Sequence, residues 1–88
     1  MNVAFDPAFI RAFKRRIGSV PNRKKKFYER LEMFRIDPFN PRLKTHKLMG
    51  NLEGLLSFSV DYDVRVIFFL QDEEHAVFVD IGTHDDVY

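Results

Sequence analysis

The chain has no cysteine among its 88 residues, and it has only four glycines and four prolines. The absence of cysteine excludes disulfide bonds and cysteine-containing zinc sites, and it fits a reducing cytoplasm. The few glycines form no loop of the kind that cradles a phosphate. The histidines and carboxylates also lack the spacing of metal ligands, so no metal or other cofactor is expected.

Long hydrophobic runs are missing as well. No apolar stretch approaches the roughly 18 residues that a membrane span requires. The first nine residues, MNVAFDPAF, lack the basic-then-apolar order of a signal peptide. We therefore expect a soluble, cytoplasmic protein with no membrane partner. The length, together with the absence of repeats and linkers, predicts a single domain over residues 1–88.

Charge is distributed unevenly along the chain, although the net charge is only +1. Residues 1–50 contain 13 Lys and Arg against 4 Asp and Glu, a balance of +9. Residues 51–88 contain one Arg against 9 Asp and Glu, a balance of −8. Such a distribution can attract a polyanion to one surface and a cationic partner to another, but solvated helix faces produce the same pattern without any ligand.

The first half of the chain has helical spacing. Asp6 followed by Pro7 predicts the start of a helix that ends at Gly18, and a second helix is expected from about Pro21 to Asp37. The short link between them predicts an antiparallel hairpin. The expected apolar faces are Phe9, Ile10, Phe13 and Ile17 in the first helix, and Val20, Phe27, Leu31 and Phe34 in the second.

The second half alternates with a period of two. Strands are expected over residues 56–60, 64–70 and 76–81, joined by polar turns, with a short edge strand at 3–5. The chain is therefore predicted to be an α+β protein, in which a helical hairpin packs on an antiparallel sheet of about four strands. Between the two halves, an extended basic loop is expected over residues 37–51; it carries Arg42, Lys44, His46 and Lys47.

One strand contains an arginine among apolar residues. In VRVIFFL, the residues Val64, Val66 and Phe68 share one face, so Arg65 must project from the other face with Ile67. There it meets solvent, a cleft or a partner. A guanidinium can contact two phosphate oxygens at once, so it could stabilise the charge of a phosphorane.

Two histidines and a carboxylate are candidates for proton transfer. His46 lies between two lysines, which favour a neutral imidazole that can accept a proton. His84 precedes two aspartates, which favour a donor. Both could equally be ordinary surface histidines, and Asp63, in the turn Asp61–Asp63, could serve turn geometry alone. Together these groups meet the needs of metal-independent RNA cleavage by a 2′-hydroxyl.

The order of elements and four short strings resemble the RelE/ParE toxin superfamily, and within it the RelE and YafQ branches. The order of elements covers nearly the whole chain, and the strings follow one another in the family's order: HKL at 46–48, GNLEG at 50–54, VRVIF at 64–68 and GTHDDVY at 82–88. The resemblance implies two helices on an antiparallel sheet and endonucleolytic cleavage of mRNA, commonly on the ribosome. It also implies neutralisation by a cognate antitoxin, and contact with operator DNA through the antitoxin complex only.

The resemblance also suggests roles for individual residues. His46, Asp63 and His84 match the family's proton-transfer residues, Arg65 matches the strand arginine of the RelE branch, and Tyr88 matches a tail aromatic that holds or stacks on RNA. The expected RNA-binding residues are Arg42, Lys44, Lys47 and Tyr88.

The sequence departs from the family pattern at two places. Ser59 stands where YafQ-type toxins have a second histidine, and the tail is acidic where that of RelE is rich in arginine. These departures leave the proton-transfer assignments open.

The leading hypothesis is a metal-independent endoribonuclease, with Arg65 stabilising the phosphorane, His84 as general acid, and Asp63 or His46 as general base. It requires Arg65, His84 and the lysine-bearing loop to meet on one concave surface. One alternative is a ParE-like inhibitor of DNA gyrase. Another is a catalytically weakened toxin that acts as an antitoxin-binding co-repressor.

Overall fold

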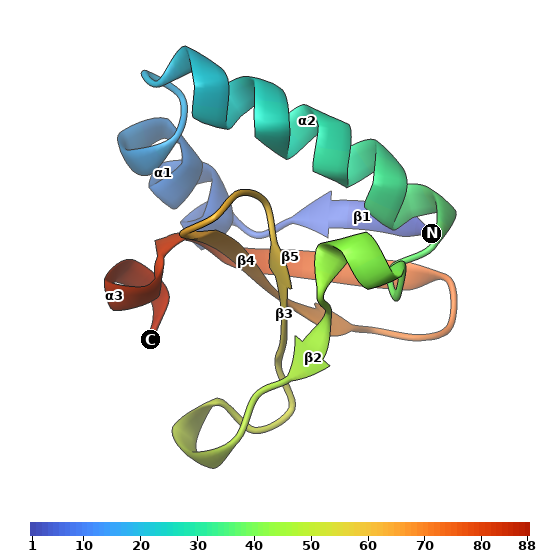
Figure 1. Ribbon diagram of the computed structural model, residues 1–88. Helices are drawn as coiled ribbons and strands as arrows, with labels where there is room; N and C mark the ends of the chain where they lie inside the picture. The colour runs from blue at the N-terminus through green and yellow to red at the C-terminus, as the bar shows by residue number, and fades with distance from the viewer.

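The computed structural model describes residues 1–88 and has two main helices packed on a five-stranded sheet. The α+β prediction is confirmed. Figure 1 shows α1 and α2 over one side of the sheet, while the loop around residue 50 projects from the other side. The elements are β1 (Asn2–Phe5), α1 (Pro7–Arg16), α2 (Pro21–Ile36), β2 (His46–Lys47), β3 (Leu56–Ser59), β4 (Val64–Leu70), β5 (His75–Thr83) and α3 (His84–Val87), with 3-10 turns at Pro41–Leu43 and Gly50–Leu52.

The sheet has the order β1-β5-β4-β3-β2, so it has five strands and not about four. All neighbouring pairs are antiparallel except β1 and β5, which are parallel. The additional strand, β2, lies in the segment expected to be an extended loop, which also contains both 3-10 turns. Two polar residues have no alternating pattern, and β2 exists only because its backbone pairs with β3.

The predicted helix start is confirmed, because the Asp6 side chain accepts a hydrogen bond of 2.8 Å from the backbone N–H of Ala8. The expected apolar faces are correct except at two residues. Ile10 is 42% exposed because α1 contacts the core along a narrower stripe, and Val20 is 38% exposed because it precedes α2 in extended conformation. No helix has both the length and the apolar character needed to cross a membrane.

The core lies between the helices and the sheet, with Phe34 of α2 at its centre. The ring of Phe34 is 5.0 Å from those of Phe58 and Phe68 and 5.1 Å from that of Phe78, measured between centroids. All four rings are fully buried. Burial of one such side chain stabilises the fold by about 1.5–3 kcal/mol. This aromatic cluster therefore fixes α2 against three strands.

The strand register decides which residues face away from the helices. Ser59 pairs with Arg65, and Arg65 pairs with Gly82, so these three residues share one face. Phe58 and Val66 form the neighbouring pair and are fully buried on the core face. The prediction that Arg65 projects away from the core is confirmed.

Candidate functional site: a cationic groove

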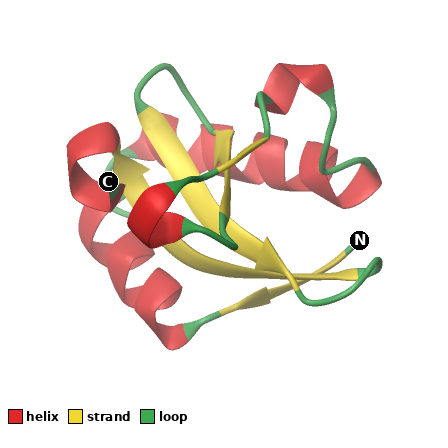
Figure 2. Cartoon of the chain, turned by 90° about the horizontal axis from the view of Figure 1, so that it is seen from below, coloured by secondary structure: helices red, strands yellow, loops and turns green.

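A groove of about 510 Å³ lies beside Arg65, at the end of the sheet that carries the β3–β4 turn. It is built by segments far apart in the sequence: α2, the segment after it, the β3–β4 turn, β4 and the first residue of α3. Figure 2 shows the backbone from below, with the sheet in front of the two main helices and α3 at the end of β5. The lining residues are Arg30, Arg42, Lys44, Ser59, Val60, Asp61, Tyr62, Asp63, Arg65 and His84.

The groove carries more positive than negative charge. Four of its lining residues are Arg or Lys and two are Asp, which gives 4 − 2 = +2 with His84 neutral. A concave wall with an excess of guanidinium and ammonium groups attracts phosphate. The three groups required by the nuclease hypothesis, Arg65, His84 and Lys44, therefore meet at one surface.

Arg65 is held in a defined position at the base of this groove. Its Nη1 donates a hydrogen bond of 2.6 Å to Oγ of Ser59, its partner on β3. The side chain is half-buried, so part of the guanidinium has a fixed partner and the remaining donors can bind a ligand. Ser59, the residue that departs from the YafQ pattern, thus orients Arg65.

His84 is placed by the start of α3. The helix begins with a capping box, in which the side chain of Thr83 accepts from the N–H of Asp86 and the carboxylate of Asp86 accepts from the N–H of Thr83. The His84 ring lies edge-on to that of Tyr88, with the centroids 4.6 Å apart. The Tyr88 hydroxyl donates to Oγ of Ser57 at 2.9 Å. Both ends of this short helix are thereby tied down.

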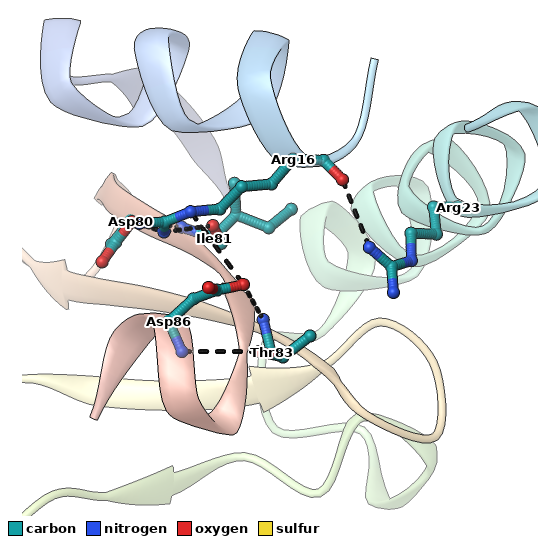
Figure 3. A network of polar contacts seen from close by, with 6 residues as sticks. All are labelled: Arg16, Arg23, Asp80, Ile81, Thr83 and Asp86. Carbon is teal, nitrogen blue, oxygen red and sulfur yellow. Dashed lines mark hydrogen bonds and ion pairs between the residues drawn. The ribbon is translucent and has the colours of Figure 1, made fainter. Parts of the chain in front are cut away.

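A polar network joins α3 to α1 and β5, as Figure 3 shows. Nη1 of Arg16 donates to the Asp80 carboxylate and to the Ile81 carbonyl, each at 3.0 Å. Nε of Arg16 lies 4.0 Å from Oδ2 of Asp86. The backbone of Arg16 in turn accepts from Arg23 of α2 at 3.3 Å. Arg16 thus connects α1, β5 and α3 close to His84, the first residue after β5.

The carboxyl of Asp86 has a pKa below its usual value of 3.8. The main cause is the Thr83 backbone N–H, followed by the Thr83 side chain, and the charges of Arg16 and Arg23 add to the effect. Asp86 is therefore a structural carboxylate in its ionised form.

Three residues expected at the site lie outside the groove. His46 is exposed on β2, where its Nδ1 is 3.0 Å from the Lys44 carbonyl. Its neighbour Lys47 faces the opposite side of β2, since it pairs with the core residue Leu56. Tyr88 contacts the His84 ring but does not itself line the groove.

The groove also contains residues that sequence reasoning did not select, chiefly Arg30 and Tyr62. Arg30 projects from α2 and donates to the Arg42 carbonyl at 3.1 Å. No local signal distinguishes Arg30 from the other cations of α2, because its place depends on how α2 crosses the sheet. Tyr62 could have been noticed as an aromatic residue in a polar turn. No group of three or more His, Asp or Glu residues is arranged to hold a metal ion.

No protein-family model matches this sequence, and no curated protein matches it. Solved structures of bacterial toxins do match over nearly the full length of both chains. The YoeB/ParE toxin from Agrobacterium tumefaciens superposes with a TM-score of 0.78 at 13% identity, covering 96% of this chain and 99% of that one. YafQ from Escherichia coli gives 0.72 at 19% identity, covering 99% and 97%.

A third similar structure is the YoeB–YefM complex from Staphylococcus aureus, with a TM-score of 0.75 at 22% identity, covering 96% of this chain and 97% of that chain. The likeness spans both helices and the whole sheet, so it concerns the complete arrangement of elements. The RelE/ParE resemblance found in the sequence is thus confirmed at the level of the fold: this chain has the fold of the YoeB, YafQ and ParE toxins.

Proposed function

We propose that this protein is the toxin of a toxin–antitoxin system and that it cleaves mRNA as a metal-independent endoribonuclease. One observation carries the proposal: Arg65, His84 and Asp63 line one groove that has an excess of positive charge. The likeness to YoeB and YafQ supports the same assignment. By resemblance to the RelE branch, the ribosome is the proposed place of cleavage.

The proposed reaction begins with the 2′-hydroxyl of one nucleotide attacking the adjacent phosphorus. Asp63 removes the hydroxyl proton as general base, Arg65 stabilises the charge on the phosphorane, and His84 protonates the departing 5′-oxygen. The products are a 2′,3′-cyclic phosphate and a free 5′-hydroxyl. Asp63 is preferred to His46 as the base because it lines the groove and His46 does not.

Two residues are proposed to hold the RNA, and two more to assist from outside the groove. Arg42 and Lys44, which line the groove, would pair with the flanking phosphates. Tyr88 supports the His84 ring through its edge-on contact. Lys47 faces the opposite side of β2, so its proposed contribution is long-range electrostatic attraction of the RNA.

The test is expression of the wild type and of His84→Ala and Arg65→Ala without antitoxin, with 5′-end mapping of cellular mRNA. The wild type is expected to stop growth and to leave defined 5′ ends. Each variant is expected to lose about a hundredfold or more of the cleavage rate while keeping the fold by circular dichroism. Growth arrest with intact mRNA and accumulating gyrase-cleaved DNA would contradict the proposal, and so would the absence of any effect on growth.

The proposed partner is a cognate antitoxin, by analogy with the YoeB–YefM and DinJ–YafQ complexes. An apolar groove of about 410 Å³ between α1 and α2 offers a surface for it. Ile10 and Tyr28 are 42% and 50% exposed there, and Lys14, Lys24 and Arg35 also line the groove. This combination suits an amphipathic antitoxin segment with apolar and acidic residues. The resulting complex is the proposed binder of operator DNA.

A further inference from the structure

Tyr62 is exposed over 95% of its surface, more than any other large apolar residue of the chain, and yet it lines the cationic groove. Its ring takes no part in the core and its hydroxyl has no hydrogen-bond partner within the protein. Folding therefore gives no reason for an aromatic side chain at this position.

The backbone beneath this ring is well fixed. The Val60 N–H donates to the Val64 carbonyl at 2.8 Å and closes the β3–β4 turn. The Tyr62 N–H donates to the Asp61 side chain at 2.8 Å. Hydrogen bonds thus define the backbone of the turn that carries the ring.

The turn also places Tyr62 close to the guanidinium of the site. Ser59 and Arg65 are directly paired across β3 and β4, and Tyr62 lies midway between them in the sequence. Three residues of chain span at most about 10–11 Å, which limits the separation of the two Cα atoms, and both side chains line the same groove. One strand of RNA bound in the groove can therefore contact both residues.

The composition of the groove indicates the chemistry of the ligand. Only Val60 and Tyr62 among its lining residues are hydrophobic, so an apolar protein segment does not fit, whereas the net positive charge suits a polyanion. A cationic groove with an aromatic ring at its rim is the arrangement by which proteins bind single-stranded nucleic acid.

We infer that the Tyr62 ring is a stacking platform for a nucleobase of single-stranded RNA whose neighbouring phosphate is bound at Arg65. This inference rests on the proposed function and adds a binding subsite to it. Because every base has a π-face, the platform contributes affinity and holds the strand in place without selecting a particular base.

The experiment measures binding of a short fluorescent 2′-O-methyl oligouridine, which lacks the attacking hydroxyl and is not cleaved. Tyr62→Ala is expected to raise Kd about 5- to 150-fold, the range that loss of one stacked base gives. Tyr62→Phe is expected to bind like the wild type, because stacking needs the ring and not the hydroxyl. With a matched oligonucleotide of abasic sites, Tyr62→Ala and the wild type are expected to bind equally.

Phe39→Ala is the control variant, because Phe39 is also an exposed aromatic, at 55%, but does not line the groove. It is expected to leave Kd unchanged. Equal binding of the base-bearing strand by the wild type and Tyr62→Ala, with Arg65→Ala impaired, overturns the platform and leaves the proposed function intact. An equal loss on both strands also overturns it, and so does failure of the wild type to bind either strand. The proposed function is contradicted only if expression without antitoxin also leaves cellular mRNA intact.

Discussion

Nε of Arg16 in α1 lies 4.0 Å from the carboxylate of Asp86 in α3, and the same guanidinium donates to Asp80 and to the Ile81 carbonyl of β5. A residue of the helical hairpin thereby holds the segment that begins with His84. His84 lines the groove, so the proposed general acid depends on a contact that extends from the helical layer.

Replacement of Arg16 by alanine is expected to release α3. The rate of mRNA cleavage should therefore fall markedly, whereas the free energy of unfolding should change little. The ion pair with Asp80 is partly exposed, at 22% and 35% of the two side chains, so the free energy of unfolding is expected to fall by only about 1 kcal/mol. Urea unfolding and RNA cleavage would be measured on the same samples. Arg16→Lys is expected to restore only part of the rate, because one ammonium cannot match the three contacts. Wild-type cleavage by Arg16→Ala would show that the network has no bearing on His84.

Gly82→Ala is expected to displace α3. A Cβ at this position would lie 2.6 Å from Cβ and 2.8 Å from Oδ2 of Asp86, and 3.0 Å from Cδ of Arg16. Because α3 cannot keep its place, cleavage should fall at least tenfold, and the crosspeaks of residues 83–88 in an NMR spectrum should shift. Gly18→Ala is the matched control, since its nearest contacts are at 3.5 Å or more and its effect on stability should stay within about 1 kcal/mol. Unchanged crosspeaks in Gly82→Ala would refute the close packing described for this strand end.

Acid is expected to weaken the attachment of α3 through Asp86. The folded protein holds the pKa of this carboxyl below the usual 3.8, so its stabilising effect is complete above that value and is lost as pH falls through the lower, folded pKa. Chemical denaturation from neutral pH to strong acid should show a smaller decline in Asp86→Asn than in the wild type. Asp72 also has a pKa below its usual value, mainly because its carboxylate accepts a hydrogen bond from the Glu74 backbone N–H. Asp72→Asn is therefore the comparison variant, with a second carboxylate of lowered pKa removed outside α3. Parallel stability curves for Asp86→Asn and the wild type would exclude this linkage.

Ile10→Asp is expected to weaken antitoxin binding without changing RNA cleavage. The substitution removes an apolar contact from the groove between α1 and α2 and places there a carboxylate, which would be desolvated on docking and would repel the acidic residues proposed for the antitoxin segment. Growth arrest should then persist when the antitoxin is co-expressed, and isothermal titration should show a lower affinity. The exposed Ile36, which does not line that groove, supplies the control Ile36→Asp. Full rescue of Ile10→Asp by the antitoxin would move the docking surface elsewhere.

The sequence by itself determined the two main helices, the three longer strands and the faces of these elements, whereas β2 and α3 were not expected from it. The Asp6 cap and the spacing of Phe27, Leu31 and Phe34 are local patterns, and local sterics and burial turn them into helices. The alternation around Arg65 likewise determined that its side chain leaves the core, because successive side chains of a strand must point to opposite faces.

Only the tertiary structure decided which residues share the groove. Lys44 enters it and His46 does not, since the chain turns at Lys44 in a left-handed conformation before β2 pairs with β3. Arg30 joins the groove, and Arg16 reaches α3, because of how the helices cross the sheet. Periodicity reports which face of an element is apolar. Contacts between side chains of distant elements depend instead on strand register, helix crossing angle and packing. No local pattern of residues encodes these three properties.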